Sequence, residues 1–320
     1  MIEKIFRKIF FIYLAVFPLI PTGINEKFKL DYILFALLVT MFFIKSVYCK
    51  KERTILKKRL IDIVKDPIVI VMAISIILMT ISSIYVKDNV GNLIESFRFF
   101  TYIILYIAIK YEFNLTRNFT KFNVVFLGQS FIIFVIGIIE LIIHKGVQVG
   151  NSRIYTVEST WGHPSIYAAY IIIMIFPLIV FLIKSKSLRI KVFTVISILC
   201  GAICLGSCTN INDNIGTVLL EVGGKIIPSN IGHLEELGKL GIIAVIAFIV
   251  ACIMIGFKLF SINKKYKNKY LGVTTGVCAT FVVFMIINVF NIMIFIPKVM
   301  TIFIALVSLC STIDAKDIRR

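Results

Sequence analysis

The chain has 320 residues, of which 59% are hydrophobic, and its formal net charge is +18. That apolar share is far above the usual share of a soluble domain and excludes an ordinary water-soluble fold. The positive charge does not predict nucleic-acid binding, because the basic residues fall in every second connector between apolar runs, as a membrane topology signal would place them.

Apolar runs of about 18 residues or more recur along the chain, and each is long enough to cross a bilayer core of about 30 Å. They lack the alternation of polar and apolar residues that a β-barrel needs. The sequence therefore predicts an all-α, polytopic transmembrane helix bundle that forms one domain over residues 1–320. Roughly ten spans fit, at residues 5–22, 30–48, 67–86, 93–110, 122–143, 164–183, 191–208, 240–257, 271–290 and 297–313.

The ends of the spans carry orientation and kink signals. The first span follows Lys4, Arg7 and Lys8 like a signal peptide, but no small-residue cleavage site follows it, so it is predicted to be an uncleaved helix. Pro18 and Pro177 lie inside predicted spans and should kink them. Connectors on the side of the N-terminus hold 26 of the 35 Lys and Arg residues, which predicts that both termini are cytoplasmic and that the bundle lies in the cell membrane.

Two connectors on the opposite side, at residues 144–163 and 208–241, are predicted to be outward loops. All three histidines, His144, His163 and His233, lie in these two loops. An ionisable group near hydrocarbon is costly, so a group retained there marks a candidate functional site.

Basic side chains on the outward side are candidates for binding phosphate. Arg153 is the only arginine in the outward loops, and a guanidinium fork suits a diphosphate. Arg98 lies one helical turn after Glu95, and His144 lies one turn after Glu140. Each of these two pairs is open to interpretation as a plain ion pair or as catalytic groups.

The cysteines predict no metal motif. Cys200, Cys204 and Cys208 recur every fourth residue and share one stripe of a helix. A metal or thiol site is one interpretation, and small packing residues on a helix–helix face is the favoured one. The sequence has no CxxC, P-loop or GxGxxG motif, so neither a metal nor a nucleotide cofactor is predicted.

Two segments resemble motifs of the O-antigen polymerase and O-antigen ligase superfamily. Arg153 is followed by GHPSIYA at 162–168, which opens a span, and PSNIG at 228–232 leads into ELGKLGII at 236–243. Members of that superfamily often carry His where this chain has Ser229, and their late outward loop usually holds a second arginine where this chain has lysines. His233, one helical turn after Ser229, is the residue expected to substitute.

The resemblance implies a metal-independent membrane glycosyltransferase that polymerises or transfers glycan units carried on polyprenyl diphosphate. The reaction would take place at the outer face of the cytoplasmic membrane, in surface or capsular polysaccharide synthesis. Cations would hold the diphosphate leaving group, and a histidine would take the proton of the acceptor hydroxyl. The residues implied are Arg153, Arg98, Lys225, Ser229 and Asn230 for substrate binding, and His233 and His163 for catalysis. The partners implied are the lipid-linked glycan, membrane lipids and polysaccharide assembly proteins.

Two other functions stay open. A transporter or flippase for a lipid-linked glycan should line the bundle with polar residues at mid-depth, and here these are few, chiefly Gln129 and Asn288. The second alternative is an inactive structural member of a polysaccharide assembly complex, and the short outward loop at residues 208–241 favours this alternative.

Overall fold

The structure is a computed structural model that describes residues 2–48, 62–85, 89–113, 115–143, 147–149, 152–154, 157–208, 242–290 and 296–317. These residues are almost entirely helical. The α-helices are α1 (Ile2–Val16), α2 (Thr22–Phe28), α3 (Leu30–Tyr48), α5 (Pro67–Tyr85), α6 (Asn89–Glu112), α7 (Leu115–Ile142), α8 (Pro164–Lys184), α9 (Leu188–Cys208), α12 (Ile242–Phe290) and α13 (Pro297–Asp317). The other elements are the 3-10 helices η1 (Phe17–Leu19) and η2 (Ser159–Trp161) and an antiparallel hairpin of β1 (Val147–Val149) and β2 (Ser152–Ile154).

Three of these helices are long and apolar enough to cross a membrane: Lys121–Ile142 within α7, α8, and α9. Their outer faces and those of other helices expose large apolar side chains, such as Leu199 and Phe257, which suit hydrocarbon and not water. These are the features of a helical membrane protein, as predicted. The number of spans, and which end faces the cytoplasm, stay predictions.

The two interior prolines differ in their effect. Pro18 does not kink a long first helix: α1 ends at Val16, Pro18 lies in η1, and the separate helix α2 follows Pro21. Two prolines three residues apart each remove a backbone N–H donor, so one continuous α-helix over the predicted span 5–22 is not sustained. Pro177 lies within α8, which stays helical over its whole length.

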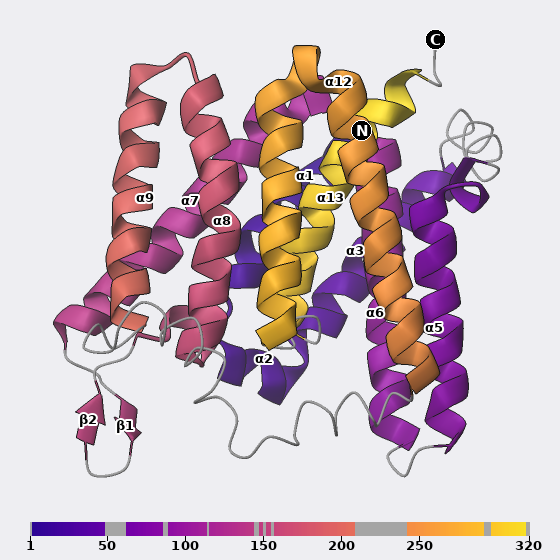
Figure 1. Ribbon diagram of the computed structural model, residues 1–320, viewed down its shortest axis with the longest axis horizontal. Coiled ribbons are helices and arrows are strands. Elements are labelled where there is room, and N and C mark those ends of the chain that lie inside the picture. The colour runs from indigo at the N-terminus through magenta and orange to yellow at the C-terminus, as the bar shows by residue number, and fades with distance from the viewer. Residues whose placement is uncertain are drawn as a thin grey trace.

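The helix α12 is folded back on itself. Its 49 residues would make a straight rod of about 74 Å. The thiol of Cys278 nevertheless lies 3.5 Å from the carbonyl oxygen of Leu259, and the hydroxyl of Thr274 donates to Asn263 at 2.6 Å. The two arms are therefore antiparallel, and they match the two spans predicted at 240–257 and 271–290 (Figure 1).

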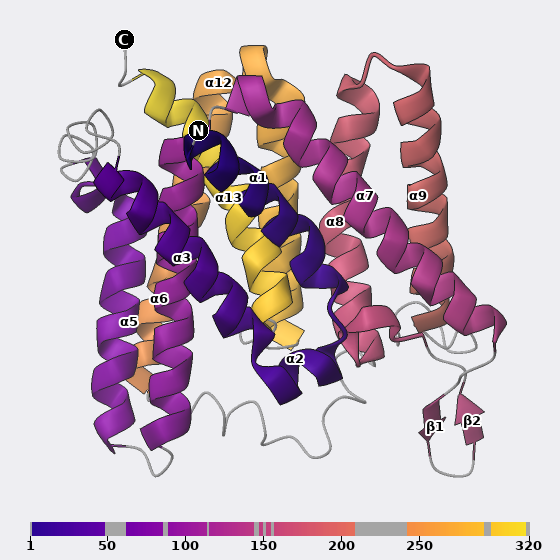
Figure 2. The same ribbon diagram turned by 180° about the vertical axis from the view of Figure 1, so that it is seen from behind.

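The helices run between two ends of the molecule. The start of α1, the end of α13 and the turn between α8 and α9 lie at one end, and η1, α2 and the β1–β2 hairpin lie at the other, as Figure 1 and Figure 2 show. We call the second the α2 end. It also holds η2 and the first turn of α13, because Trp161 and Lys298 form hydrogen bonds with Thr22 at the start of α2. The helix α8 begins at Pro164, directly after η2.

The centre of the bundle is α13, whose side chains are buried all round from Lys298 to Ile313. The cysteine stripe of α9 packs against neighbouring backbone: the thiol of Cys204 lies 3.5 Å from the carbonyl oxygen of Phe134, and that of Cys208 lies 3.4 Å from that of Val157. No group of three or more His, Cys, Asp or Glu residues in the described part of the chain could hold a metal ion. The arrangement favours the packing interpretation of this stripe.

Candidate functional site

A tight turn at η2 is the best-defined polar structure at the α2 end. Ser159 has a φ of +50° and Gly162 a φ of +69°, so the backbone adopts the left-handed region at two positions before α8 begins. The carboxylate of Glu140, near the end of α7, accepts hydrogen bonds from the backbone N–H groups of Ser159 at 2.7 Å and Glu158 at 3.2 Å. Oε2 of Glu140 is therefore the acceptor for both of these backbone N–H groups. Its partners are these N–H groups, and the side chain of His144, its predicted partner, lies outside the described residues.

The turn buries Trp161, which is 1% exposed and stacks on Tyr170 with ring centroids 4.5 Å apart. The hydroxyl of Thr22 donates to the carbonyl oxygen of Trp161 at 2.8 Å and contacts that of Thr160 at 3.2 Å. Thr160 in turn donates from its hydroxyl to the carbonyl oxygen of Pro18 at 3.1 Å. Three hydrogen bonds thus join the turn to Thr22 of α2 and Pro18 of η1, which lie about 140 positions away in the sequence.

Lys298 attaches the last helix to the same turn. Its ammonium group donates to the carbonyl oxygen of Thr160 at 2.7 Å and to the hydroxyl of Thr22 at 3.3 Å, and it lies 5.1 Å from the centroid of the Trp161 ring. The residue is only 3% exposed. The sequence pattern did not single it out, although a lysine in the first turn of a helix opposes the helix dipole and so indicates a specific partner.

His163 caps the start of α8. Its Nδ1 accepts a hydrogen bond from the backbone N–H of Ser165, so the neutral ring carries its proton on Nε2. Partial burial of the ring lowers the pKa of His163 from its usual 6.5, although the residue as a whole is exposed at the surface. The same lone pair cannot cap the helix and accept a substrate proton at once, so a role as a base would require the ring to leave the cap. Its catalytic role stays a prediction.

Glu158, beside the turn, is perturbed in the opposite direction. Burial raises the pKa of the Glu158 carboxyl, and the negative charge of nearby Glu140 raises it further.

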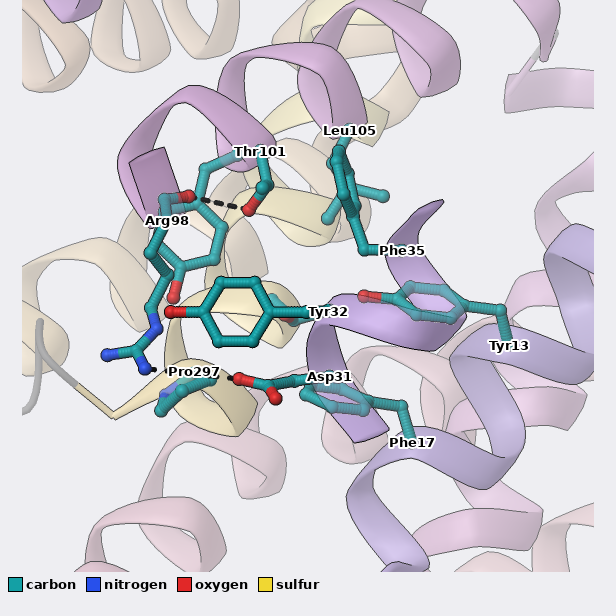
Figure 3. A pocket seen from close by; sticks show the side chains of 11 residues that line it. Tyr13, Phe17, Asp31, Tyr32, Phe35, Arg98, Thr101, Leu105 and Pro297 are labelled. Atoms are coloured by element: carbon teal, nitrogen blue, oxygen red, sulfur yellow. Dashed lines mark hydrogen bonds and ion pairs between the residues drawn. The ribbon is translucent and has the colours of Figure 1, made fainter. Parts of the chain in front are cut away.

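A cleft beside this turn holds Arg98, which was predicted to bind substrate. Nη2 of Arg98 on α6 lies 4.0 Å from Oδ2 of Asp31, in the first turn of α3, and its guanidinium carbon lies 5.5 Å from the centroid of the Tyr32 ring (Figure 3). The enclosed space of the cleft is small, about 20 Å³, which is room for one or two water molecules. Its lining residues are Tyr13, Phe17, Asp31, Tyr32, Phe35, Arg98, Thr101, Tyr102, Leu105, Pro297 and Thr301.

The α2–α3 corner places Asp31. Lys29 joins the two helices with a φ of +50°, and Oδ1 of Asn25 accepts a hydrogen bond from the backbone N–H of Asp31 at 2.9 Å. A carboxylate at the first turn of a helix also interacts favourably with the helix dipole. The predicted partner of Arg98 was Glu95, whose side chain is outside the described part, and the ion pair that the structure places there is with Asp31.

The cleft and the turn share two elements of the fold. Thr22 of α2 contacts the turn, and the α2–α3 corner carries Asp31. On α13, Pro297 lines the cleft and its neighbour Lys298 contacts the turn. The structure therefore brings the predicted residues Arg98 and His163 to one end of the bundle.

The remaining predicted residues are only partly placed. Arg153 lies on β2, paired with Gln148 of β1, and its side chain is outside the described part. The segment 209–241 is also outside it, and with it Lys225, Ser229, Asn230 and His233.

Comparisons with known proteins add no relative: no protein-family model, no curated protein and no solved structure matches the chain.

Proposed function

We propose that this chain is a membrane glycosyltransferase that joins glycan units carried on polyprenyl diphosphate at the outer face of the cytoplasmic membrane. The substrate would be held at the α2 end, which in this proposal faces outward. No metal or cofactor is part of the proposal.

One observation carries this function more than any other. Charged and polar side chains from segments far apart in the sequence gather at the α2 end of the bundle: Arg98, Asp31, Lys298, Glu140 and His163. Ionisable groups beside hydrocarbon are costly and are retained chiefly where they serve a function. A lipid-linked substrate needs this combination, because its tail lies in the membrane while its diphosphate and sugars lie at the membrane surface.

The resemblance of residues 162–168 and 228–243 to O-antigen polymerases and ligases supports the same class of reaction. In the proposal, Arg153 and Lys225 hold the diphosphate, and Ser229 and Asn230 contact the substrate. His233 takes the proton of the acceptor hydroxyl, because His163 already uses one ring nitrogen to cap α8.

The test is polymerisation by the purified full-length chain in liposomes that contain a polyprenyl-diphosphate-linked oligosaccharide. We expect Arg153→Ala and His233→Ala to abolish long polymer while the lipid-linked unit persists. Arg189→Ala is the matched control, because Arg189 is exposed at the start of α9, at the other end of the bundle. Polymer of normal length from both test variants would refute the proposal.

The same liposomes separate the alternatives. Movement of labelled lipid-linked glycan across the bilayer without joining of units would assign the chain to the transporters. Binding of the glycan with neither movement nor joining would assign it to the structural members of an assembly complex.

A further inference from the structure

The cleft between α3, α6 and α13 has the size of a site for ordered water. Its enclosed space is about 20 Å³. A cavity holds a water molecule once this space reaches about 10–15 Å³. The cleft therefore takes one or two water molecules and is too small for a sugar ring or a phosphate group.

The lining of the cleft is polar enough to retain water. An apolar cavity stays dry, whereas a buried water molecule is held where it finds two to four polar partners. The lining of this cleft includes the carboxylate of Asp31, the guanidinium of Arg98 and the hydroxyls of Thr101 and Thr301. These groups come from α3, α6 and α13, so a water molecule among them bridges separate helices.

One oxygen atom in the cleft calls for a hydrogen-bond donor. Oδ2 of Asp31 faces Arg98, whereas Oδ1 is buried and has no hydrogen-bond partner in the described part of the chain (Figure 3). A buried acceptor without a donor is costly, and buried water molecules lie chiefly at such groups. A water molecule has two O–H donors, so it can donate to Oδ1 and still bind a hydroxyl on a neighbouring helix.

The charges of the cleft favour water over an ion of similar size. The Asp31 carboxylate lies 4.0 Å from the guanidinium of Arg98, and the two side chains are only 11% and 16% exposed. A monovalent cation that approaches Asp31 is repelled by Arg98, and an anion that approaches Arg98 is repelled by Asp31. Both repulsions are strong where bulk water is scarce. A neutral donor meets neither.

From these observations we infer that the cleft is a binding site for one or two ordered water molecules, which donate to Oδ1 of Asp31 and bridge α3 to α6 and α13. The water molecules and the Arg98–Asp31 ion pair form one polar connection between these helices. Thr301 lies one helical turn after Lys298, which contacts the η2 turn, so the same helix joins the water site to that turn. The site does not depend on the proposed glycosyltransferase activity, and a transporter would retain it.

The experiment is hydroxyl-radical labelling by synchrotron X-rays of the full chain in lipid nanodiscs, with the modified residues identified by mass spectrometry. X-rays produce the radical from water, so a buried side chain is labelled only where water lies beside it. Phe17 lines the cleft and is 1% exposed, whereas Phe10 is 0% exposed and does not line it. We expect several-fold more label on Phe17 than on Phe10, which is its matched reference for ring chemistry and burial.

Two variants of Thr301 test the position of the water. Thr301→Ile replaces the hydroxyl with carbon and fills the small cavity, so the label on Phe17 should fall to the level of Phe10. Thr301→Ser keeps the hydroxyl and leaves the space open, so its label should equal that of the unmodified chain or exceed it. If Thr301→Ile fails to fold, a structure of the unmodified chain at a resolution that shows water replaces it, and a peak at hydrogen-bond distance from Oδ1 of Asp31 is expected.

Three results would overturn the water site. The first is a label on Phe17 no higher than that on Phe10, which would show a dry cleft. The second is a label that Thr301→Ile leaves unchanged, which would place the water elsewhere. The third is an anomalous peak at Asp31 in crystals soaked in thallium(I), which would show that the cleft holds a monovalent cation. Polymer synthesis in liposomes tests the proposed function separately, because none of these results depends on activity.

Discussion

Replacement of Glu140 should open the η2 turn without unfolding the bundle. In Glu140→Ala, the backbone N–H groups of Ser159 and Glu158 lose the carboxylate that accepts from both. Each buried donor left without an acceptor costs about 1–3 kcal/mol. Both bonds are only partly buried, so we expect a combined local cost of about 2–4 kcal/mol, which raises the open fraction of the turn roughly 30- to 1,000-fold.

The chain carries its own probe of this change, because Trp161 is its only tryptophan and is buried inside the turn. In nanodiscs, Glu140→Ala should shift the emission of Trp161 to longer wavelength and increase its quenching by acrylamide. Glu140→Gln retains one neutral acceptor oxygen, so its effect should be smaller and of the same sign.

The neighbouring carboxylate gives the control. Burial raises the pKa of Glu158, so the folded turn binds more protons than the unfolded chain at pH values just above 4.5, and the turn loses stability as the pH rises through that window. Glu158→Gln should remove this loss and leave Trp161 as buried as before at neutral pH. Emission and quenching in Glu140→Ala equal to those of the unmodified chain would refute the assignment of Glu140 as the support of the turn.

Three more predictions follow from the packing and the polar contacts. Lys298→Met should make Trp161 accessible to acrylamide, because the turn loses a buried donor to its backbone; an unchanged quenching constant would contradict this. Gly276→Ala would place its new methyl 2.3 Å from Val180, and this overlap should lower the free energy of unfolding by about 1–3 kcal/mol. Gly128→Ala meets nothing within 4 Å and should be neutral or slightly stabilising. Equal melting temperatures of the two variants would contradict this. The pKa of His163 is lowered, so the helix cap that it forms loses stability as the pH falls below 6.5. We expect Trp161 emission to report this loss, and His163→Asn should remove the pH dependence. A dependence equal to that of the unmodified chain would contradict this.

Much of the helical framework could be predicted from apolar run length and proline positions. The spans predicted at 164–183 and 191–208 match α8 and α9 closely, because Pro164 sets the start of α8 and the exposed connector 185–187 separates the two. Pro297 sets the start of α13 in the same way. The first span was the exception, since it was read as one kinked helix and the prolines divide it.

The site was harder to predict, because its parts are brought together by tertiary packing alone. Asp31, Thr22 and Lys298 each stand at the start of a helix, where polar residues are ordinary, and nothing in their spacing relates them. Lys298 lies 276 positions from Thr22 and 138 from Thr160. Arg98 and His163 could be found from sequence because they are ionisable groups beside long apolar runs. Their partners, Asp31 and the backbone N–H of Ser165, could not.

The attachment of Lys298 to the η2 turn also bears on how the protein is made. The helix α13, which carries Lys298, follows Thr22 and Trp161 in the sequence and is therefore synthesised after them. The α2 end therefore cannot acquire its final shape until α13 has entered the bundle. A nascent chain halted before Pro297 should already hold α8 and α9 yet present an unfinished α2 end, so this end is completed only when α13 fills the centre of the bundle.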